Sequence, residues 1–185
     1  MNIESYLRET VTVAESLNRE HLQSLLDQLS NLRENNGRLF IIGVGGSAAN
    51  ASHAVNDFRK IAKIDACTPL DNVSELTARI NDDGWDSCIT NTLKVSNFGK
   101  NDAILTLSVG GGSENTSLNL VRAMQHAKLS GGKVFGIVSR DGGMTAKLAD
   151  ACVIIPPVNQ ETITPHAEEF QAVVWHMLVT LLGKQ

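Results

Sequence analysis

The sequence has few cysteines and no long hydrophobic run, and each scarcity excludes a class of protein. The three cysteines, Cys67, Cys88 and Cys152, lie far apart, in or beside apolar runs. This spacing fits neither a disulfide framework nor a zinc ribbon, so we expect three buried thiols. No apolar run approaches the ~18 residues of a membrane span. We therefore predict a soluble protein with no membrane partner.

Positive charge is also scarce, and the opening segment is polar. Lysine and arginine number 16 against 20 aspartates and glutamates, which gives a net charge of −4, and there is no basic run. Binding to nucleic acid requires a basic footprint, so we expect no nucleic-acid partner. The first residues, MNIESYLRET, have neither the charged start nor the apolar centre of a secretory signal. We expect a cytoplasmic protein.

Short apolar runs alternate with helical patterns, which predicts a single α/β domain over residues 1–185. Residues 1–36 read as helical, with a break near Asn18, and their leucine stripe could pack on the core or on a neighbouring subunit. The expected strands are 39–42, 66–70, 103–109, 133–138 and 151–156. The later expected helices are 47–63, 74–80, 86–95, 114–129, 144–148 and 164–182, with a polar loop at 81–85. Such alternation is typical of a parallel sheet with helices on both faces.

A glycine-rich turn follows the first expected strand. Residues 43–46 read GVGG and allow a sharp turn, and Ser47 suits the N-cap of the next helix. Free N–H groups and the positive end of the helix dipole make such a turn an anion site. The alternative is a tight loop selected for packing alone.

A second glycine and serine cluster follows the third expected strand, where Ser108 and Ser113 flank three glycines. In open parallel sheets, ligands bind beyond the carboxyl ends of the strands, where the strand order reverses. Two such clusters predict a cup for a phosphate monoester. The alternatives are a mobile turn with ordinary caps, or a dinucleotide site through GVGGSA. The acidic partner of a dinucleotide site, Asp65 or Asp71, is not well placed.

Two expected helices each carry a histidine and a carboxylate. His53 and Asp57 lie four residues apart on one helix face. His176 lies within a last helix that is apolar all round, so we expect its side chain to be buried. Glu168 is ~80° away from it around that helix. Two histidines and two carboxylates could hold a divalent metal, whereas a lone buried histidine is more often a satisfied core residue.

These motifs together resemble the sugar isomerase domain family, and within it the phosphoheptose isomerases. The likeness spans nearly the whole chain and rests on GVGGSAANASHAVNDF, INDDGWD, SVGGGSEN, SRDGG and HAEEFQAVVWHMLV. It implies a five-stranded flavodoxin-like parallel sheet and a homotetramer with sites between subunits, and zinc in many members. The implied reaction converts sedoheptulose 7-phosphate to a heptose 7-phosphate, a precursor of ADP-heptose and lipopolysaccharide.

The resemblance also implies residue roles. Asp57, in place of a glutamate, and His176 would be the acid and base groups of an aldose–ketose isomerisation through an enediol. Zinc, or another divalent metal, would be held by His53, Asp57, Glu168 and His176, with Glu168 in place of a glutamine. The implied contacts to substrate and phosphate are Val44, Gly45, Gly46, Ser47, Asn81, Asp82, Ser108, Ser113 and Glu168.

Some positions depart from the family pattern and leave a second reading open. Val44 replaces an asparagine, and Val109 and Gly110 replace two hydroxyl residues of the phosphate motif. Replication-initiator-associating proteins resemble these isomerases but act through protein contacts as tetramers. A scaffold has no need of His53, Asp57 and His176. We therefore predict a phosphosugar isomerase, with a non-catalytic phosphosugar-binding or protein-interaction tetramer as the alternative.

Overall fold

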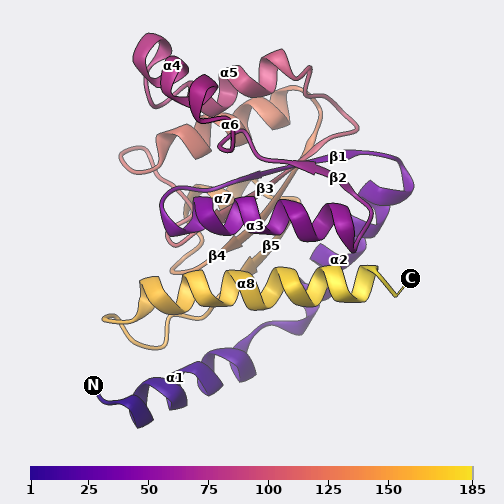
Figure 1. Cartoon of the computed structure of the whole chain (residues 1–185). Helices are drawn as coiled ribbons and strands as arrows, with labels where there is room; N and C mark the ends of the chain where they lie inside the picture. The colour runs from indigo at the N-terminus through magenta and orange to yellow at the C-terminus, as the bar shows by residue number, and fades with distance from the viewer. Residues whose placement is uncertain (185) are drawn as a thin grey trace.

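The computed structural model describes residues 1–184 and contains a five-stranded parallel sheet between two layers of helices (Figure 1). The strands are β1 (Arg38–Ile42), β2 (Asp65–Cys67), β3 (Ala103–Ser108), β4 (Lys133–Val138) and β5 (Ala151–Ile154). The helices are α1 (Ile3–Ser16), α2 (Arg19–Glu34), α3 (Gly46–Lys60), α4 (Val73–Asp83), α5 (Cys88–Val95), α6 (Leu118–Leu129), α7 (Gly143–Leu148) and α8 (Ile163–Leu182). The predicted α/β class and the five-stranded parallel sheet are confirmed.

The strand order is β2-β1-β3-β4-β5, the flavodoxin-like order. After β1 the chain moves to one side to form β2, and then returns to the other side of β1 to form β3. Leu39 pairs with Ala103, and Ile42 pairs with Thr106. The order therefore reverses between β1 and β3, and the carboxyl ends of these two strands define the position where a ligand is expected.

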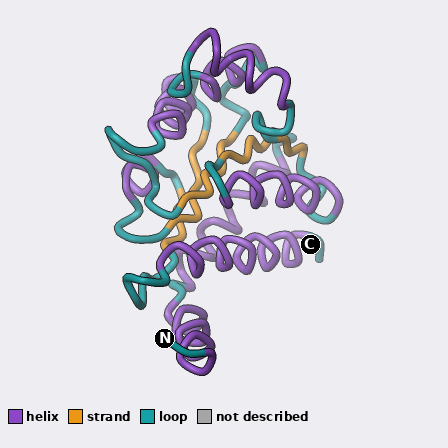
Figure 2. The backbone as a smooth tube through the Cα atoms, turned by 60° about the vertical axis from the view of Figure 1, so that its left-hand side comes forward, coloured by secondary structure: helices purple, strands orange, loops and turns teal. Residues whose placement is uncertain are grey.

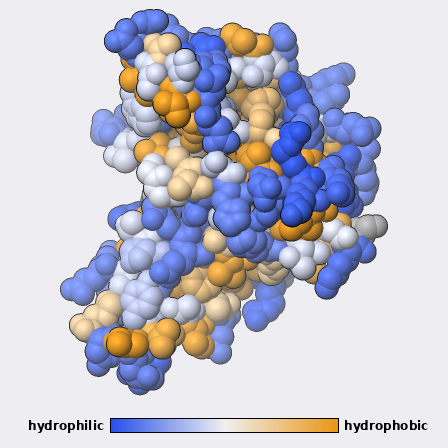
Figure 3. Space-filling view, viewed as in Figure 1, coloured by the Kyte–Doolittle hydropathy of each residue, from blue (hydrophilic) through white to orange (hydrophobic). Residues whose placement is uncertain are grey.

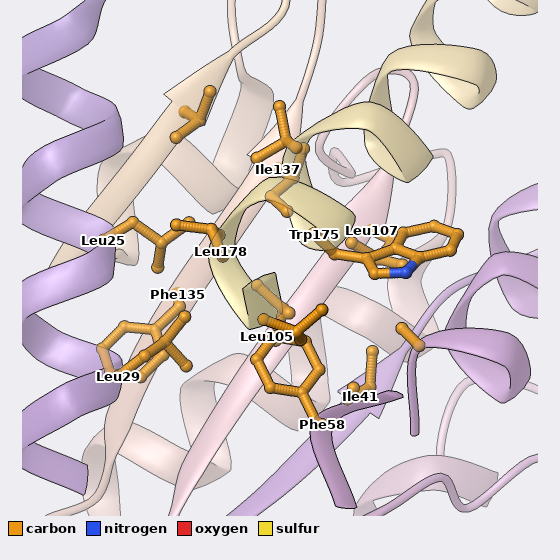
Figure 4. Packing of buried hydrophobic residues seen from close by; sticks show 14 of the residues in the cluster. Leu25, Leu29, Ile41, Phe58, Leu105, Leu107, Phe135, Ile137, Trp175 and Leu178 are labelled. Atoms are coloured by element: carbon orange, nitrogen blue, oxygen red, sulfur yellow. The ribbon is translucent and has the colours of Figure 1, made fainter. Parts of the chain in front are cut away.

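Each face of the sheet buries its own hydrophobic cluster. On one face, α2, α3 and α8 cover the strands with fully buried side chains such as Leu25, Phe58 and Trp175 (Figure 4). On the other face, α5 and α6 pack through Leu93 and Met124. β3 lies in the middle and is buried along its whole length, which explains its continuous apolar run. This double layer holds β1 and β3, and hence the loops that follow them, in fixed positions.

The helical region at the start of the chain divides into two parts with different surroundings. α2 begins after Asn18, whose side chain accepts hydrogen bonds from the first turn, and its leucine stripe packs on its own domain. α1 lies beside α8, away from the sheet (Figures 1 and 2). Its residues Ile3, Leu7 and Val11 are 82%, 55% and 55% exposed. Figure 3 shows hydrophobic surface at the bottom of the molecule, where α1 lies. The unpartnered apolar stripe therefore lies on α1 and not on α2.

Several boundaries differ from the sequence-based expectation. The first residues of the predicted loop at 81–85 form the last turn of α4. This helix ends at Asp83 and is capped by Gly84, which has a φ of +81°. α6 begins four residues later than predicted, because Ser117 adopts a left-handed conformation with a φ of +54°. β2 ends at Cys67, before the Thr68–Pro69 pair.

The predicted helix starts and the predicted burial of the three thiols also differ from the structure. The N-cap of α3 is Gly45, so Ser47 lies inside the first turn, and α8 is capped at Thr162 rather than at 164. Only Cys88 is a buried thiol, whereas Cys152 is half-buried and Cys67 is exposed. Cys67 lies on the short strand at the edge of the sheet, where alternate side chains face outward. Within residues 1–184, the helices lack the combination of length and hydropathy needed to cross a bilayer.

Candidate active site

The two predicted glycine and serine loops meet at the carboxyl edge of the sheet. A cavity of about 510 Å³ opens there, between the loop after β1 and the loop after β3. Residues from the turn after β4 and from the start of α8 complete its wall. The lining residues are Val44, Ser47, Ser108, Val109, Gly110, Gly112, Ser113, Thr116, Ser117, Arg140 and Thr164. The cavity therefore occupies the position where the strand order reverses.

We name this cavity the cup. Its serine hydroxyl groups are arranged as donors. Ser108 Oγ accepts a hydrogen bond from the Gly111 N–H at 3.1 Å. Ser113 Oγ accepts from the Thr116 N–H at 3.1 Å. Because both oxygens accept from backbone N–H groups, their own O–H groups are available to donate. Three further hydroxyls, which the sequence analysis missed, line the same cavity, on Thr116, Ser117 and Thr164.

The start of α3 has two sides with different neighbours. Gly45 has φ 65° and ψ −129°, a conformation essentially restricted to glycine, and α3 begins immediately after it. Val44 and Ser47 line the cup, whereas Gly45 and Gly46 do not. A Cβ at Gly46 would collide with the carboxylate of Glu168. That carboxylate therefore lies at the start of α3, the positive end of the helix dipole.

A buried glutamine connects α3 to α8 beside the cup. Gln171 is fully buried, and its Nε2 donates to Ser47 Oγ at 3.0 Å. Its Oε1 accepts from Asn50 Nδ2 at 2.9 Å, and the same Nδ2 donates to the Glu168 carbonyl at 2.9 Å. The sequence analysis missed this residue. Its signal was a polar side chain inside the apolar run of the last helix.

Further along the same two helices, His53 and Asp57 of α3 meet His176 of α8. The Nε2 atoms of His53 and His176 lie 3.5 Å and 3.2 Å from Asp57 Oδ2. One ligand atom from each of these three residues lies within 4.8 Å of the others, so together they could hold a metal ion. Sequence spacing could not show that the two helices meet, and the structure brings together three of the four predicted metal ligands.

Asp57 is the buried centre of this His-Asp-His cluster. Its residue exposure is 7%, and its Oδ2 accepts a hydrogen bond from the fully buried Trp175 Nε1 at 3.4 Å. Its Oδ1 accepts from Asn56 Nδ2 at 3.0 Å. Both oxygens of this carboxylate therefore have a hydrogen-bond donor that holds the side chain in place.

The orientation of His176 directs its Nε2 at Asp57. Its Nδ1 lies 2.9 Å from the Ala172 carbonyl oxygen, which can only accept, so Nδ1 carries a hydrogen. In neutral His176, the lone pair of Nε2 would then face the Asp57 carboxylate, with two acceptors 3.2 Å apart. A proton on Nε2 or a metal ion resolves this conflict. Metal-binding histidines commonly donate their other N–H to a backbone carbonyl in this way.

One expectation for this cluster was wrong. The side chain of His176 is 49% exposed, not buried, because it lies on the side of α8 that faces away from the sheet. Glu168 is not among the three residues that meet here, since its carboxylate lies against Gly46, and its binding to a metal stays a prediction. Eight residues separate it from His176, about 12 Å along the helix axis.

The three remaining residues could hold a divalent metal ion. Two nitrogen or oxygen ligands of a tetrahedral zinc, at 2.0–2.1 Å from the metal, lie about 3.3 Å apart. The separations of 3.5 Å and 3.2 Å from Asp57 Oδ2 are close to that value. Three protein ligands leave a fourth position free, which is typical of catalytic zinc sites.

The predicted substrate residues Asn81 and Asp82 lie elsewhere. Both are exposed on the last turn of α4, where Asn81 Nδ2 donates to Asp82 Oδ1 at 2.7 Å. Neither is among the residues that line the cup. Their contact with substrate stays a prediction.

The chain belongs to the SIS domain family, whose sequence profile matches residues 4–139. Among curated relatives, it is 31% identical to the phosphoheptose isomerase of a Nitratiruptor species, over 82% of this chain and 79% of the relative. It is 27% identical to the probable phosphoheptose isomerase of Thermoplasma volcanium, over 98% of this chain and 91% of the relative.

Solved structures agree on the fold. The phosphoheptose isomerase of Neisseria gonorrhoeae superposes with a TM-score of 0.84 at 22% identity, covering 99% of this chain and 97% of that one. The expected family resemblance is therefore confirmed.

Proposed function

We propose that this chain is a phosphosugar aldose–ketose isomerase that converts sedoheptulose 7-phosphate to a heptose 7-phosphate. The observation that carries the proposal is that α3 and α8, which form the His-Asp-His cluster, also reach the cup, through Ser47 and Thr164. The curated relatives named as phosphoheptose isomerases support the choice of substrate. A site that only bound phosphate would not need the cluster.

The spacing along α3 suits a substrate with a phosphate at one end and a carbonyl at the other. Ser47 lines the cup, and His53 and Asp57 follow it by six and ten residues. At 1.5 Å per residue these positions lie ~9 and ~15 Å from Ser47 along the helix axis. A linear sugar phosphate held in the cup would extend along α3 and present its first two carbons to the cluster.

Proton transfer would be divided between the two charged groups. Asp57 would remove a proton from C1 of the ketose, giving an enediol, and return it to C2. Oδ2 is the oxygen next to the two histidines, so Oδ1, which accepts a hydrogen bond from Asn56, would be the oxygen that accepts this proton. Without a metal on its Nε2, His176 would move the other proton between the oxygens on C1 and C2 through that atom, whereas a metal bound there would take over this role. The products differ from the substrate only in the positions of two hydrogens.

A divalent metal, most simply zinc, would be held by His53, Asp57 and His176. When bound, it would polarise the carbonyl of the sugar. The fixed Nδ1–H of His176 and the conflict of acceptors with Asp57 support this assignment.

The exposed cluster supports a multimeric enzyme with sites between subunits. The side chains of His53 and His176 are 57% and 49% exposed in the single chain. Enediol chemistry needs protection from water. A neighbouring copy in a homotetramer would cover the cluster, and α1 supplies an apolar stripe for assembly. The cytoplasm stays the predicted compartment, in keeping with a metabolic enzyme.

The test is an isomerase assay with sedoheptulose 7-phosphate on the purified protein. Asp57→Asn and His176→Gln should each lower turnover by about 100- to 10,000-fold, the usual contribution of a general acid or base. His21→Gln, an exposed histidine on α2, is the matched control and should leave turnover unchanged. Chelation should lower the melting temperature, because a metal that binds the folded state stabilises it, and added zinc should restore it.

Two results would contradict the proposal. Binding of the sugar phosphate without any turnover would favour the non-catalytic alternative. Turnover that survives Asp57→Asn would remove Asp57 from the chemistry.

A further inference from the structure

Arg140 is a cation that the sequence analysis did not include in the site. Among the described residues that line the cup, it alone carries a formal charge. Its aliphatic stem passes over Gly110, because a Cβ placed at that glycine would lie 3.8 Å from Arg140 Cδ. In the part of the chain that the structure describes, Arg140 makes no ion pair with a carboxylate. Its guanidinium is therefore free to meet an anion.

The backbone of Arg140 is strained. Its φ is +54°, in the left-handed region that favours glycine. The Gly142 N–H donates to the Ser139 carbonyl at 2.9 Å, so Arg140 is the first central residue of a tight turn. A turn with positive φ at that position alone is of type II′, where glycine is preferred. An arginine at such a position is typical of a functional constraint.

Hydrogen bonds on both sides of the turn that contains Arg140 hold this turn beside the cup. Ser139 Oγ donates to the Ile155 carbonyl at 2.8 Å, and the Ser139 N–H donates to the Val109 carbonyl at 3.1 Å. On the far side, Thr145 Oγ1 donates to the Gly111 carbonyl at 2.7 Å. These bonds fix the turn against the loop after β3, so the Arg140 stem is held over that loop.

We propose that Arg140 is the charged anchor of the phosphate group and sets the preference for phosphorylated substrates. This inference rests on the proposed function of the cup. A phosphate monoester carries about −1.5 to −2 charges at pH 7. Arginine offers a planar fork of N–H donors that matches phosphate oxygens. The family resemblance places hydroxyl residues at 109 and 110, where this chain has Val109 and Gly110. Arg140 supplies the donors that these positions lack.

Arg140→Gly separates binding from folding. Glycine removes the guanidinium and relieves the positive φ, so the melting temperature should stay equal or rise. Affinity for inorganic phosphate, measured by calorimetry, should fall by about tenfold or more, the usual effect of losing hydrogen bonds to a charged group. The salt dependence of binding should also become weaker, because one cation is lost.

Two further variants control for charge and position. Arg140→Lys keeps the positive charge and should retain more phosphate affinity than Arg140→Gly. Lys147→Ala removes an equal charge from α7, the next helix, and should leave affinity unchanged, because Lys147 is exposed and does not line the cup. Phosphate affinity of Arg140→Gly within about twofold of the parent protein would overturn the inference.

The same variants distinguish this inference from the proposed isomerase. With sedoheptulose 7-phosphate, Arg140→Gly should raise KM by about tenfold or more with little change in kcat, since the phosphate is remote from the reacting carbons. An unchanged KM would overturn the role of Arg140 and leave the isomerase intact. Loss of phosphate affinity in a protein that shows no turnover would support Arg140 and reject the isomerase.

Discussion

At the scale of single residues, the site depends on polar side chains inside apolar surroundings. Among the predicted phosphate-binding residues, Gln171 hydrogen-bonds to the side chain of Ser47 alone. Its side chain makes no described hydrogen bond to the His-Asp-His cluster. It hydrogen-bonds to Ser47 at the cup and to Asn50, which is one helical turn before His53. Because it is fully buried, its partners cannot turn to water if it is replaced. It therefore sets the position of α3 relative to α8.

Gln171→Leu tests that role. The change keeps most of the side-chain volume and leaves two polar groups without this partner, so we expect a loss of about 1–3 kcal/mol in the free energy of unfolding. Urea denaturation measures it. Gln125→Leu, on the exposed face of α6, should change stability by no more than about 0.5 kcal/mol. Equal stability of both variants would show that the buried amide is not needed to hold α3.

At the scale of elements, α1 is joined to the rest of the chain by a small polar cluster. Glu9 Oε2 accepts from Thr162 Oγ1 at 2.7 Å and lies 3.2 Å from Nε2 of the buried His166. Tyr6 donates to Glu169 at 2.6 Å. The hydrogen bond from Asn159 to Glu9, together with that from Thr162, lowers the pKa of the Glu9 carboxyl below its ordinary 4.5.

This lowered pKa predicts that α1 loosens in acid. A group with a depressed folded-state pKa contributes stability above its unfolded-state pKa, near 4.5, and loses that contribution as the pH falls through the lower folded value. Limited proteolysis or hydrogen exchange of α1 should therefore accelerate below about pH 4.5. Glu9→Gln should already loosen α1 at neutral pH and weaken the pH dependence. Glu15→Gln, an exposed residue of the same helix, should behave as the parent.

At the scale of the whole molecule, two surfaces of the chain are incomplete alone. The outer stripe of α1 is apolar, and the two histidines of the His-Asp-His cluster are about half exposed. Both features are explained if further copies of the chain pack on these surfaces, as the proposed homotetramer requires.

Leu7→Asp should prevent that assembly. The leucine is 55% exposed, so an aspartate there should leave the fold of the single chain intact while placing a charge in an apolar contact. Light scattering should show a smaller species than the mass of four chains, and isomerase activity should fall with it. Leu129→Asp, at an 88% exposed leucine on α6, is the control. A Leu7→Asp protein that keeps the mass of the parent would exclude α1 from the interface.

The sequence alone determined the α/β class, the five strands and the two glycine loops, because periodicity and turn chemistry are local properties of the chain. It also gave His53, Asp57 and His176, which the structure brings together, as candidates for the chemistry. Only the tertiary structure decided which side chains meet. Glu168 and His176 share a helix, yet the Glu168 carboxylate lies at the start of α3. Arg140 reaches the cup from the turn after β4. Such meetings depend on how helices cross and which way side chains point, and sequence spacing contains neither.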